Sequence, residues 1–373
     1  MLYLRVLCLA MLLAACADNR SPEVADDTAP LTITVAATLR PPATDTASAT
    51  VTLSATSTAT LTPRPPLTPT STPTPHPLSI PLMRLQSYPG SDITLEETLE
   101  PGSTYNRYIA SYYSEGLKIY TLLTVPFGDP PSTGWPAIVF NHGYIKPELY
   151  KPTERYEKYV DALASHGYIV FRPDYRGHGN SEGKATGGFS SPAYTIDVLN
   201  AVSSIQRYPL ADPDRIGMWG HSMGGQITLR AMVITCCAIR AGAIWSGVVA
   251  PYDTIITRWH TTATPAGVTP IATSWRQGFV DTSGDAATNP AFWAEISPNT
   301  YLADISGPLQ LHHATGDQVV PVNFSRLLYS EMLEAGRTVF YFEYKGDDHN
   351  ISENFGLAME RTIAFFDESV KDR

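Results

Sequence analysis

Hydrophobic and polar residues alternate in the first part of the region that follows residue 82. Two such segments, 105–113 and 117–125, flank Ser-Glu-Gly and predict an antiparallel hairpin. Further along, short and nearly continuous apolar segments are separated by longer amphipathic ones, which is typical of strands that alternate with helices. Strands that are apolar on both sides must be covered on both faces, so we predict a mostly parallel sheet between two layers of helices.

Six apolar segments are candidate strands of that sheet, and five longer segments are candidate helices. The strand candidates are PAIVFNH, YIVFRPD, RIGMWG, AGAIWSGV, PLQLHHA and TVFYFEY. The helix candidates cover residues 153–165, 192–206, 222–235, 322–335 and 355–370. No internal repeat of propeller or solenoid length is present. We therefore expect one α/β domain over residues 82–373.

The segment WGHSMGG places Ser222 between a candidate strand and a candidate helix. In that setting a GxSxG motif makes a sharp turn, with Gly220 and Gly224 removing side chains that would clash, and the serine hydroxyl projects above the sheet. The free N–H groups at the start of the next helix would lie near a negative charge that develops on a substrate. We predict that Ser222 is a nucleophile; the alternative is a serine in a plain glycine-rich turn.

A serine hydroxyl needs a base to remove its proton, and the base needs an acid that orients it. In hydrolases built on this strand, elbow and helix unit, the acid and then the base follow the serine along the chain, on loops after later strands. Asp317 follows PLQLHH and His349 follows TVFYFEY, so they are the predicted acid and base. The less well-placed candidates lie within or before a strand, in the elbow, or beside His349: His221, Asp304, His312, His313, Asp347 and Asp348.

The oxyanion of an acyl-transfer intermediate needs two hydrogen-bond donors. One is predicted to be the backbone N–H of Met223, the residue after the nucleophile. The second is expected from the loop FNHGYIKPE, where Gly143 permits a tight turn and the N–H of Tyr144 can face the site. A plain strand exit is the alternative reading of this loop.

Cofactors, metals and nucleic acids find little support in the sequence. The stretch DYRGHGNSEG (174–183) follows a strand but continues as a loop, whereas a dinucleotide site needs its glycines to open a helix. The chain has no HExxH motif or His/Asp cluster, and its four cysteines lack zinc-site spacing, so we expect no metal. The net charge is −10 and no Lys/Arg cluster stands out, which disfavours nucleic acid as a partner.

Several segments together resemble the α/β-hydrolases, most closely the catalytic domain of the prolyl oligopeptidase family, over about residues 105–370. They are NHGY, PDYRGHGNSEG, GHSMGG, SPNTYLADISGPLQLHHATGDQVVP and GDDHN. The resemblance implies an α/β-hydrolase fold and a serine hydrolase with Ser222, Asp317 and His349 as its triad. That family usually carries a β-propeller ahead of the catalytic domain, whereas only a tether and a hairpin are expected here. Single-domain relatives similar to dienelactone hydrolases and cinnamoyl esterases act on carboxylic esters, so ester and peptide substrates both stay open.

Residues 251–300 lie between two strand candidates and are rich in aromatic residues. In the fold that the resemblance implies, an insertion at this place tends to cover the active site as a cap. Trp259, Trp275 and Trp293 are then candidates for lining a substrate cleft. Alternatively, these side chains pack a helix onto the sheet.

The first sixteen residues, MLYLRVLCLAMLLAAC, combine one early basic residue, Arg5, with an apolar core and small residues that end in Cys16. The apolar run is short for a membrane span and has the parts of an export signal. Its last four residues resemble the bacterial lipobox, which implies cleavage before Cys16 and a lipid on its thiol. The protein is then expected on the cell membrane, facing outside the cytoplasm; an ordinary secretory signal is the alternative.

Residues 17–81 consist largely of Thr, Ser, Pro and Ala. Such a segment has too little apolar surface to offset the entropy of ordering it, so we expect a disordered tether. The remaining cysteines of the folded part are Cys236 and Cys237. A bridge between adjacent cysteines is strained, and we expect both to be buried and unpaired.

The leading hypothesis is a lipid-anchored serine hydrolase that forms an acyl-enzyme on Ser222 with a small ester or a short peptide. The alternatives are a serine peptidase proper, an acyltransferase, and a non-catalytic binding protein on a hydrolase scaffold. The triad does not distinguish an ester from a peptide, because the two differ only in the leaving group. The physiological substrate and the oligomeric state stay open.

Overall fold

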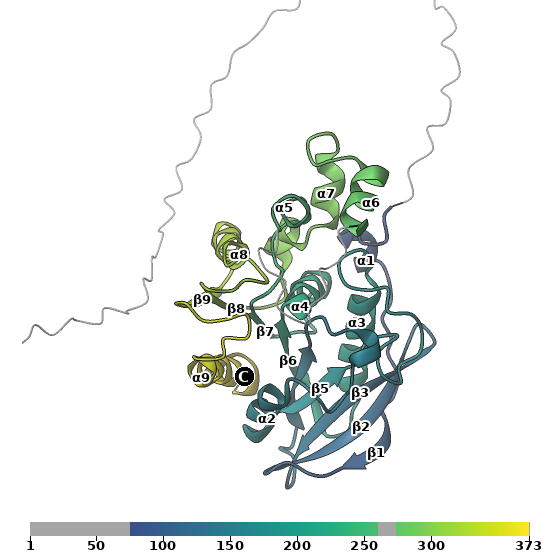
Figure 1. Ribbon diagram of the computed structural model, residues 1–373. Coiled ribbons are helices and arrows are strands. Elements are labelled where there is room, and N and C mark those ends of the chain that lie inside the picture. Colours follow the sequence, from purple (N-terminus) through teal and green to yellow (C-terminus); the bar gives the residue numbers. More distant parts are fainter. Residues whose placement is uncertain (1–74, 260–273, 373) are drawn as a thin grey trace, which may run out of the picture. The chain divides into compact units, whose positions relative to one another are not determined.

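Nine strands in the described residues, 75–259 and 274–372, form one sheet in the computed structural model (Figure 1). Their order across the sheet is β1-β2-β3-β5-β4-β6-β7-β8-β9. The first three strands and β5 are joined by antiparallel pairing, and the strands from β5 through β9 pair in parallel. In chain order the strands are β1 Thr94–Leu99, β2 Tyr105–Ser114, β3 Leu117–Pro126, β4 Trp135–Asn141, β5 Ile169–Pro173, β6 Ala211–His221, β7 Ala241–Trp245, β8 Leu309–Ala314 and β9 Val339–Tyr344.

Helices cover both faces of the sheet, as the apolar strands require (Figure 1). The α-helices are α1 Ile80–Arg84, α2 Glu157–Ser165, α3 Ala193–Ile205, α4 Met223–Ile234, α5 Tyr252–Arg258, α6 Ser274–Ser283, α7 Pro290–Ile296, α8 Asn323–Glu334 and α9 Phe355–Phe366. Shorter helical segments are η1 Pro147–Leu149, η2 Pro298–Asp304 and η3 Asp367–Lys371. The predicted hairpin, the six predicted strands and the five predicted helices are all present, so the expected α/β-hydrolase architecture is confirmed.

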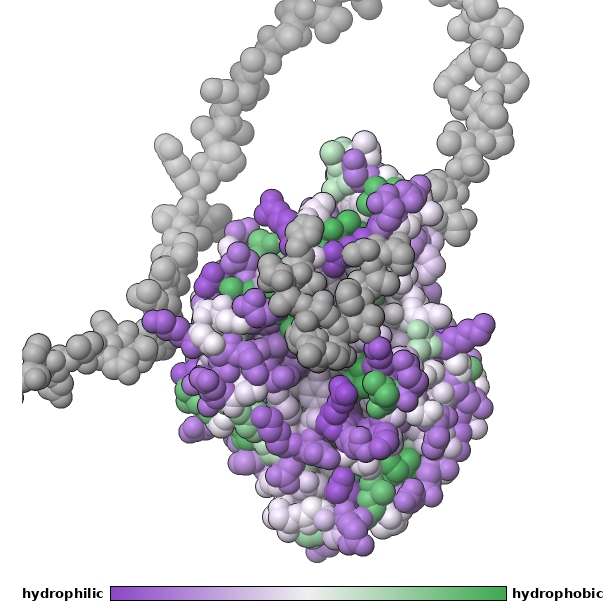
Figure 2. Space-filling view, viewed as in Figure 1, coloured by the Kyte–Doolittle hydropathy of each residue, from purple (hydrophilic) through white to green (hydrophobic). Residues whose placement is uncertain are grey.

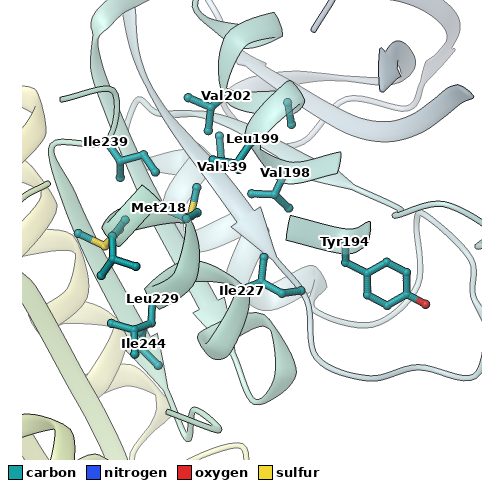
Figure 3. Packing of buried hydrophobic residues seen from close by; sticks show 14 of the residues in the cluster. Val139, Tyr194, Val198, Leu199, Val202, Met218, Ile227, Leu229, Ile239 and Ile244 are labelled. Atoms are coloured by element: carbon teal, nitrogen blue, oxygen red, sulfur yellow. The ribbon is translucent and has the colours of Figure 1, made fainter. Parts of the chain in front are cut away.

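The hydrophobic core lies on both sides of the sheet. On one side, α1, α3, α4 and α8 bury their apolar faces; Figure 3 shows how Val198 and Val202 of α3, Met218 of β6 and Ile227 of α4 gather there. On the other side, α2 and α9 pack against the sheet. On the face shown in Figure 2, polar residues predominate and hydrophobic residues form separate patches. The strands β6 and β8, which precede Ser222 and Asp317, are therefore held in a packed core.

The folded part begins earlier than the expected boundary at residue 82. Leu78 and Ile80 are fully buried, and Ser79 caps α1 by accepting a hydrogen bond from the Leu82 N–H (3.2 Å). The buried Arg230 guanidinium donates to the Leu78 carbonyl (2.8 Å). The tether prediction is wrong here because apolar residues within this Pro-rich segment pack against distant helices: Leu78 joins the cluster of α5, α6 and α7, and α1 contacts α4 and α7. The expected signal at 1–16 with Cys16, and residues 17–74 of the tether, lie outside the described residues.

Cys236 and Cys237 are exposed, which corrects the expectation that they are buried. Helix α4 ends at Ile234, so both cysteines lie in the loop that leads to β7 rather than in the helix. Their Sγ atoms are 3.0 Å apart and both thiols are free, as expected. No helix within the described part of the chain is long and apolar enough to cross a membrane.

Candidate active site

Ser222 lies in the turn between β6 and α4 with a backbone conformation that non-glycine residues rarely adopt, φ 56° and ψ −118°. Such a conformation costs free energy and persists only where neighbours hold it. Here the Ser222 N–H donates to the Trp245 carbonyl (3.0 Å), and the Ser222 carbonyl accepts from the Val248 N–H (3.1 Å). Two bonds to the segment at the end of β7 therefore hold the predicted nucleophile in place.

Glycine is required on both sides of Ser222 because the backbone is crowded. A Cβ on Gly220 would overlap the Gly224 carbonyl and the Thr228 hydroxyl. A Cβ on Gly224 would overlap the Asn141 carbonyl at the end of β4. The two glycines of the motif thus allow α4 to pack directly on the strand ends, as the elbow interpretation requires.

The structure brings Asp317 and His349 together from the ends of β8 and β9. The Nδ1 atom of His349 lies 2.7 Å from Oδ2 of Asp317. The Asp317 side chain is fully buried and 16% of the His349 side chain is exposed. His349 and Ser222 line the same pocket. The three predicted triad residues therefore converge on one site.

Every partner of the Asp317 carboxylate is a hydrogen-bond donor. Its Oδ1 accepts from the backbone N–H groups of Val319 (2.7 Å) and Val320 (2.9 Å). Its Oδ2 accepts from His349 and also from His313 Nε2 (3.1 Å). Burial raises the pKa of Asp317, but the hydrogen bonds from His313 and His349 outweigh burial and hold that pKa well below its usual range. Asp317 is thus ionised at neutral pH.

His313 contacts the Asp317 carboxylate, which the sequence analysis did not predict. Its position only four residues before Asp317 was the one sequence feature that could have indicated this contact. Its Nε2 also lies 3.0 Å from the Val320 carbonyl, and its Nδ1 lies 2.7 Å from the Ser325 hydroxyl. A carbonyl only accepts, so Nε2 carries the proton and Nδ1 accepts from Ser325. His313 therefore donates to both Asp317 and Val320.

The predicted oxyanion donors lie beside the nucleophile. Met223 is the first residue of α4, where backbone N–H groups have no acceptor within the helix, and it lines the pocket together with Tyr144. The N–H of Gly143 is already used, since it donates to the Tyr156 hydroxyl (2.9 Å). In this loop the N–H of Tyr144, not that of Gly143, therefore stays the predicted second donor.

Comparison with known proteins agrees with this geometry. The model of a family described as serine aminopeptidase, S33, matches residues 136–278. Human dipeptidyl peptidase 8 is 31% identical over 124 residues, 32% of this chain and 14% of that protein. The Bacillus subtilis protein named uncharacterized peptidase YtmA is 24% identical over 67% of this chain and 88% of its own length.

Solved structures with the same fold include peptidases and esterases. The acylaminoacyl peptidase of Pyrococcus horikoshii superimposes with a TM-score of 0.58 and 24% identity, covering 72% of this chain and 42% of its own. The acetyl xylan esterase of Paenibacillus sp. R4 superimposes with a TM-score of 0.58 and 16% identity, covering 76% of this chain and 91% of its own. The chain has the α/β-hydrolase fold. It spans 14% of dipeptidyl peptidase 8 and 42% of the acylaminoacyl peptidase. The fold, the family match and the triad geometry are together those of a serine hydrolase.

In this hydrolase a second histidine connects the three loops that carry the site. His221, beside the nucleophile, has its Nε2 2.9 Å from the His349 carbonyl and its Nδ1 2.7 Å from the Tyr156 hydroxyl. The carbonyl only accepts, so Nε2 carries the proton, Tyr156 donates to Nδ1, and Tyr156 in turn accepts from the Gly143 N–H. The pKa of His221 is lowered to about 3, mainly by burial and secondly by the nearby His349. The sequence analysis set His221 aside as a less well-placed candidate in the elbow and did not consider Tyr156.

Replacing Tyr156 with phenylalanine should weaken both folding and catalysis. The buried Gly143 N–H and His221 Nδ1 would lose their partner, which costs about 1–3 kcal/mol of unfolding free energy. The loops of the nucleophile and the base would also lose a shared anchor, so we expect kcat to fall about 10-fold with a smaller change in KM. Denaturant unfolding and steady-state kinetics test this, with the exposed Tyr113→Phe as control. If Tyr156→Phe and Tyr113→Phe had equal effects, Tyr156 would not be a shared anchor of the two loops.

The pocket of the hydrolase has a volume of about 420 Å³ and contains the reactive groups. Trp259, one of the predicted cleft residues, lines it beside Phe189 and donates its Nε1–H to the Val319 carbonyl (2.8 Å). Trp293 does not line it, which corrects that prediction: it is buried against Tyr252 and Phe279 in a separate cluster of α5, α6 and α7. The Trp275 side chain lies outside the described residues.

A buried polar cluster lies behind the oxyanion loop. The ring of His142 is stacked between those of Tyr150 and Tyr175, with centroids 4.9 and 4.2 Å away. Tyr150 donates to Oδ1 of Asp174 (2.6 Å), and Arg172 lies buried beside them. Burial raises the pKa of Asp174 from 3.8 to about 7, although Tyr150 and Arg172 act in the opposite direction.

This cluster predicts a pH dependence of stability. Between pH 3.8 and about pH 7 the folded protein holds a proton on Asp174 that the unfolded chain has lost, so stability falls as the pH rises through this window. The loss is on the order of 4 kcal/mol at most. Asp174→Asn should remove it, so the unfolding free energy of the variant relative to wild type should rise between pH 4.5 and 8. Denaturant unfolding checks this, with the exposed Asp129→Asn as control; parallel curves would contradict it.

Proposed function

We propose that this serine hydrolase cleaves carboxylic esters through an acyl-enzyme on Ser222. The observation that carries the proposal is the convergence of Ser222 with the bonded pair Asp317 and His349 on one pocket. In the first step His349 takes the proton of the serine hydroxyl as the oxygen attacks the ester carbonyl. The N–H groups of Met223 and Tyr144 then bind the oxyanion, and Asp317 stabilises the imidazolium.

In the second half of the reaction, His349 gives its proton to the leaving alcohol, which departs. Water then enters, loses a proton to the same histidine and attacks the acyl-enzyme, and the acid is released with Ser222 restored. The buried, ionised Asp317 holds the imidazole with its proton on Nδ1 throughout. Nε2 is thus free to accept and return the proton in each half of the reaction.

Peptide cleavage is the second candidate, because the matched family is described as a serine aminopeptidase. An aminopeptidase must bind a positively charged terminal amine, for which a carboxylate is the natural partner. No Asp or Glu is among the described residues that line the pocket. That observation favours esters over peptides with a free amino terminus.

The full chain should therefore hydrolyse a short 4-nitrophenyl ester faster than an aminoacyl-4-nitroanilide, and a fluorophosphonate probe should label Ser222. The Ser222→Ala variant serves as the blank for all three measurements. Dominant anilide turnover would favour the peptidase. Absence of both activities together with no labelling would favour a non-catalytic binding protein on this scaffold.

We also propose that the hydrolase is exported and anchored by a lipid on Cys16. The support is the sequence of residues 1–16, with its apolar core and the final Leu-Ala-Ala-Cys. Expression in a bacterium fed an alkyne-labelled fatty acid should give a labelled protein in the membrane fraction. The Cys16→Ser variant should lose the label. A wild-type protein that carries no label would overturn the anchor.

A further inference from the structure

The charge of the active-site pocket is opposite in sign to that of the whole chain. The chain has a net charge of −10. The described residues that line the pocket nevertheless include two permanent cations, Arg155 and Lys158, and no carboxylate. Binding a neutral ester does not require two cations that form no salt bridge with a carboxylate.

Arg155 is placed at the pocket by a fixed backbone. Both Arg155 and Tyr156 have left-handed φ angles, 58° and 56°, immediately before α2. The buried guanidinium of Arg172 holds this turn, since Nη1 donates to the Arg155 carbonyl (2.9 Å) and Nη2 donates to the Pro152 carbonyl (2.5 Å). The Tyr156 hydroxyl ties the other side of the turn to Gly143. Arg155 therefore extends from a turn that is anchored on both sides.

Lys158 is held in the first turn of α2 by aromatic rings. Its Nζ lies 3.9 Å from the centroid of the Phe355 ring and 5.4 Å from that of Tyr159. Cations are disfavoured near a helix N-terminus, because the partial charge there is already positive. Lys158 thus adds positive charge at a place where the helix itself opposes it.

The neighbouring carboxylates, from the segment around the start of α2 and from the loop after β9, form no salt bridge with these two cations. Glu154 pairs with Lys151 (2.5 Å), and Glu157 is exposed and does not line the pocket. Asp347 and Asp348 follow β9 and accept hydrogen bonds from backbone N–H groups of residues 348–354. Neither Arg155 nor Lys158 forms a salt bridge with a carboxylate of the described residues.

We propose that the substrates of this hydrolase carry a carboxylate, which Arg155 and Lys158 bind while the scissile ester lies at Ser222. The inference rests on the proposed ester hydrolysis and names the substrate class of the same site. A guanidinium can bind a carboxylate through two parallel hydrogen bonds, and an ammonium adds a second point charge. The acidic remainder of the chain disfavours anions elsewhere on the surface, so this attraction is local to the pocket.

Two matched ester pairs separate the charge from the ester chemistry. On the leaving-group side, 4-acetoxybenzoate is compared with the neutral 4-acetoxybenzamide. On the acyl side, the 4-nitrophenyl monoester of adipic acid is compared with 4-nitrophenyl hexanoate. The quantity measured is the ratio of kcat/KM for the anionic ester to that for its neutral partner, with the full chain. Intrinsic reactivity cancels when this ratio is compared between variants.

We expect Arg155→Gln and Lys158→Gln each to lower this ratio about 5-fold for at least one pair, mainly through KM, and the double variant to lower it further. Arg155→Glu should lower it more than Arg155→Gln, because repulsion replaces attraction. The wild-type ratio should also fall between 20 and 500 mM salt, since salt screens exposed charges. Lys184→Gln, an exposed cation that does not line the pocket, should leave the ratio unchanged. Melting temperatures establish that the variants are folded.

The possible outcomes distinguish this inference from the function on which it rests. If the neutral esters are hydrolysed with dependence on Ser222 but the ratio is the same in wild type, Arg155→Glu and the double variant, the carboxylate site is wrong and ester hydrolysis stands. If none of the four esters reacts, the proposed function fails and the inference fails with it. A ratio that falls for one pair only assigns the carboxylate to that side of the scissile bond.

Discussion

Replacing Ser222 with alanine should lower kcat/KM for ester hydrolysis by about 10⁴-fold or more. The change removes the side-chain oxygen of Ser222, which is the proposed nucleophile. Ser222 lies in the turn between β6 and α4 and has a left-handed φ. The turn itself is held by backbone bonds to Trp245 and Val248, which do not involve the side chain. The variant should therefore fold as the wild type does, and only its chemistry should be lost.

Kinetics with a 4-nitrophenyl ester, covalent labelling and thermal unfolding together test this expectation. The variant should show no labelling by a fluorophosphonate and no more than a small change in melting temperature. Ser330→Ala, an exposed serine on α8, is the matched control and should keep full activity and labelling. Substantial esterase activity in Ser222→Ala would show that another group performs the attack and would contradict an acyl-enzyme on Ser222.

Replacing Asp317 with asparagine should lower kcat by about 10³- to 10⁴-fold while leaving the shape of the site intact. The carboxylate accepts from backbone N–H groups at Oδ1 and from His349 and His313 at Oδ2. Backbone N–H groups only donate, so the amide oxygen of asparagine must take the place of Oδ1. Its NH₂ group then faces His349, whose Nδ1 must become the acceptor. The proton moves to Nε2, and His349 loses the lone pair that receives the serine proton.

The same substitution also tests the role of Asp317 in stability. Its lowered pKa means that the ionised carboxylate stabilises the fold above the pKa of the unfolded chain, and that this contribution is lost as the pH falls towards the folded-state pKa. The unfolding free energy of Asp317→Asn should thus fall furthest below that of wild type at neutral pH, and the difference should shrink in acid. The exposed Asp214→Asn is the control. Retention of most of the wild-type kcat by Asp317→Asn would assign the acid to another residue.

The order of the strands and helices and the positions of Ser222, Asp317 and His349 could be predicted from the sequence, because each depends on a local pattern. Apolar periodicity marks the core strands, and the GxSxG motif around Ser222 is a local pattern between a strand and a helix. Gly220 is needed by backbone four residues away, whereas Gly224 is needed by the distant Asn141 carbonyl at the end of β4. The acid and the base each follow a strand directly, and parallel strands end at one edge of the sheet. Strand β1 was missed because five of its six residues are exposed and carry no apolar pattern.

Only the tertiary structure decided which side chains meet. Tyr156 and His221 are 65 positions apart, and His221 and His349 are 128 positions apart. No local sequence pattern could therefore predict that a series of hydrogen bonds joins the three loops. Contacts between distant segments also bury Leu78 and bring Arg155 and Lys158 to the pocket. Periodicity and turn chemistry act between near neighbours in the chain, so the sequence by itself determined most strands and helices of the sheet and the places of Ser222, Asp317 and His349 after their strands. Contacts between distant segments form only when the sheet is assembled, and they decided the support, the charge and the lining of the site.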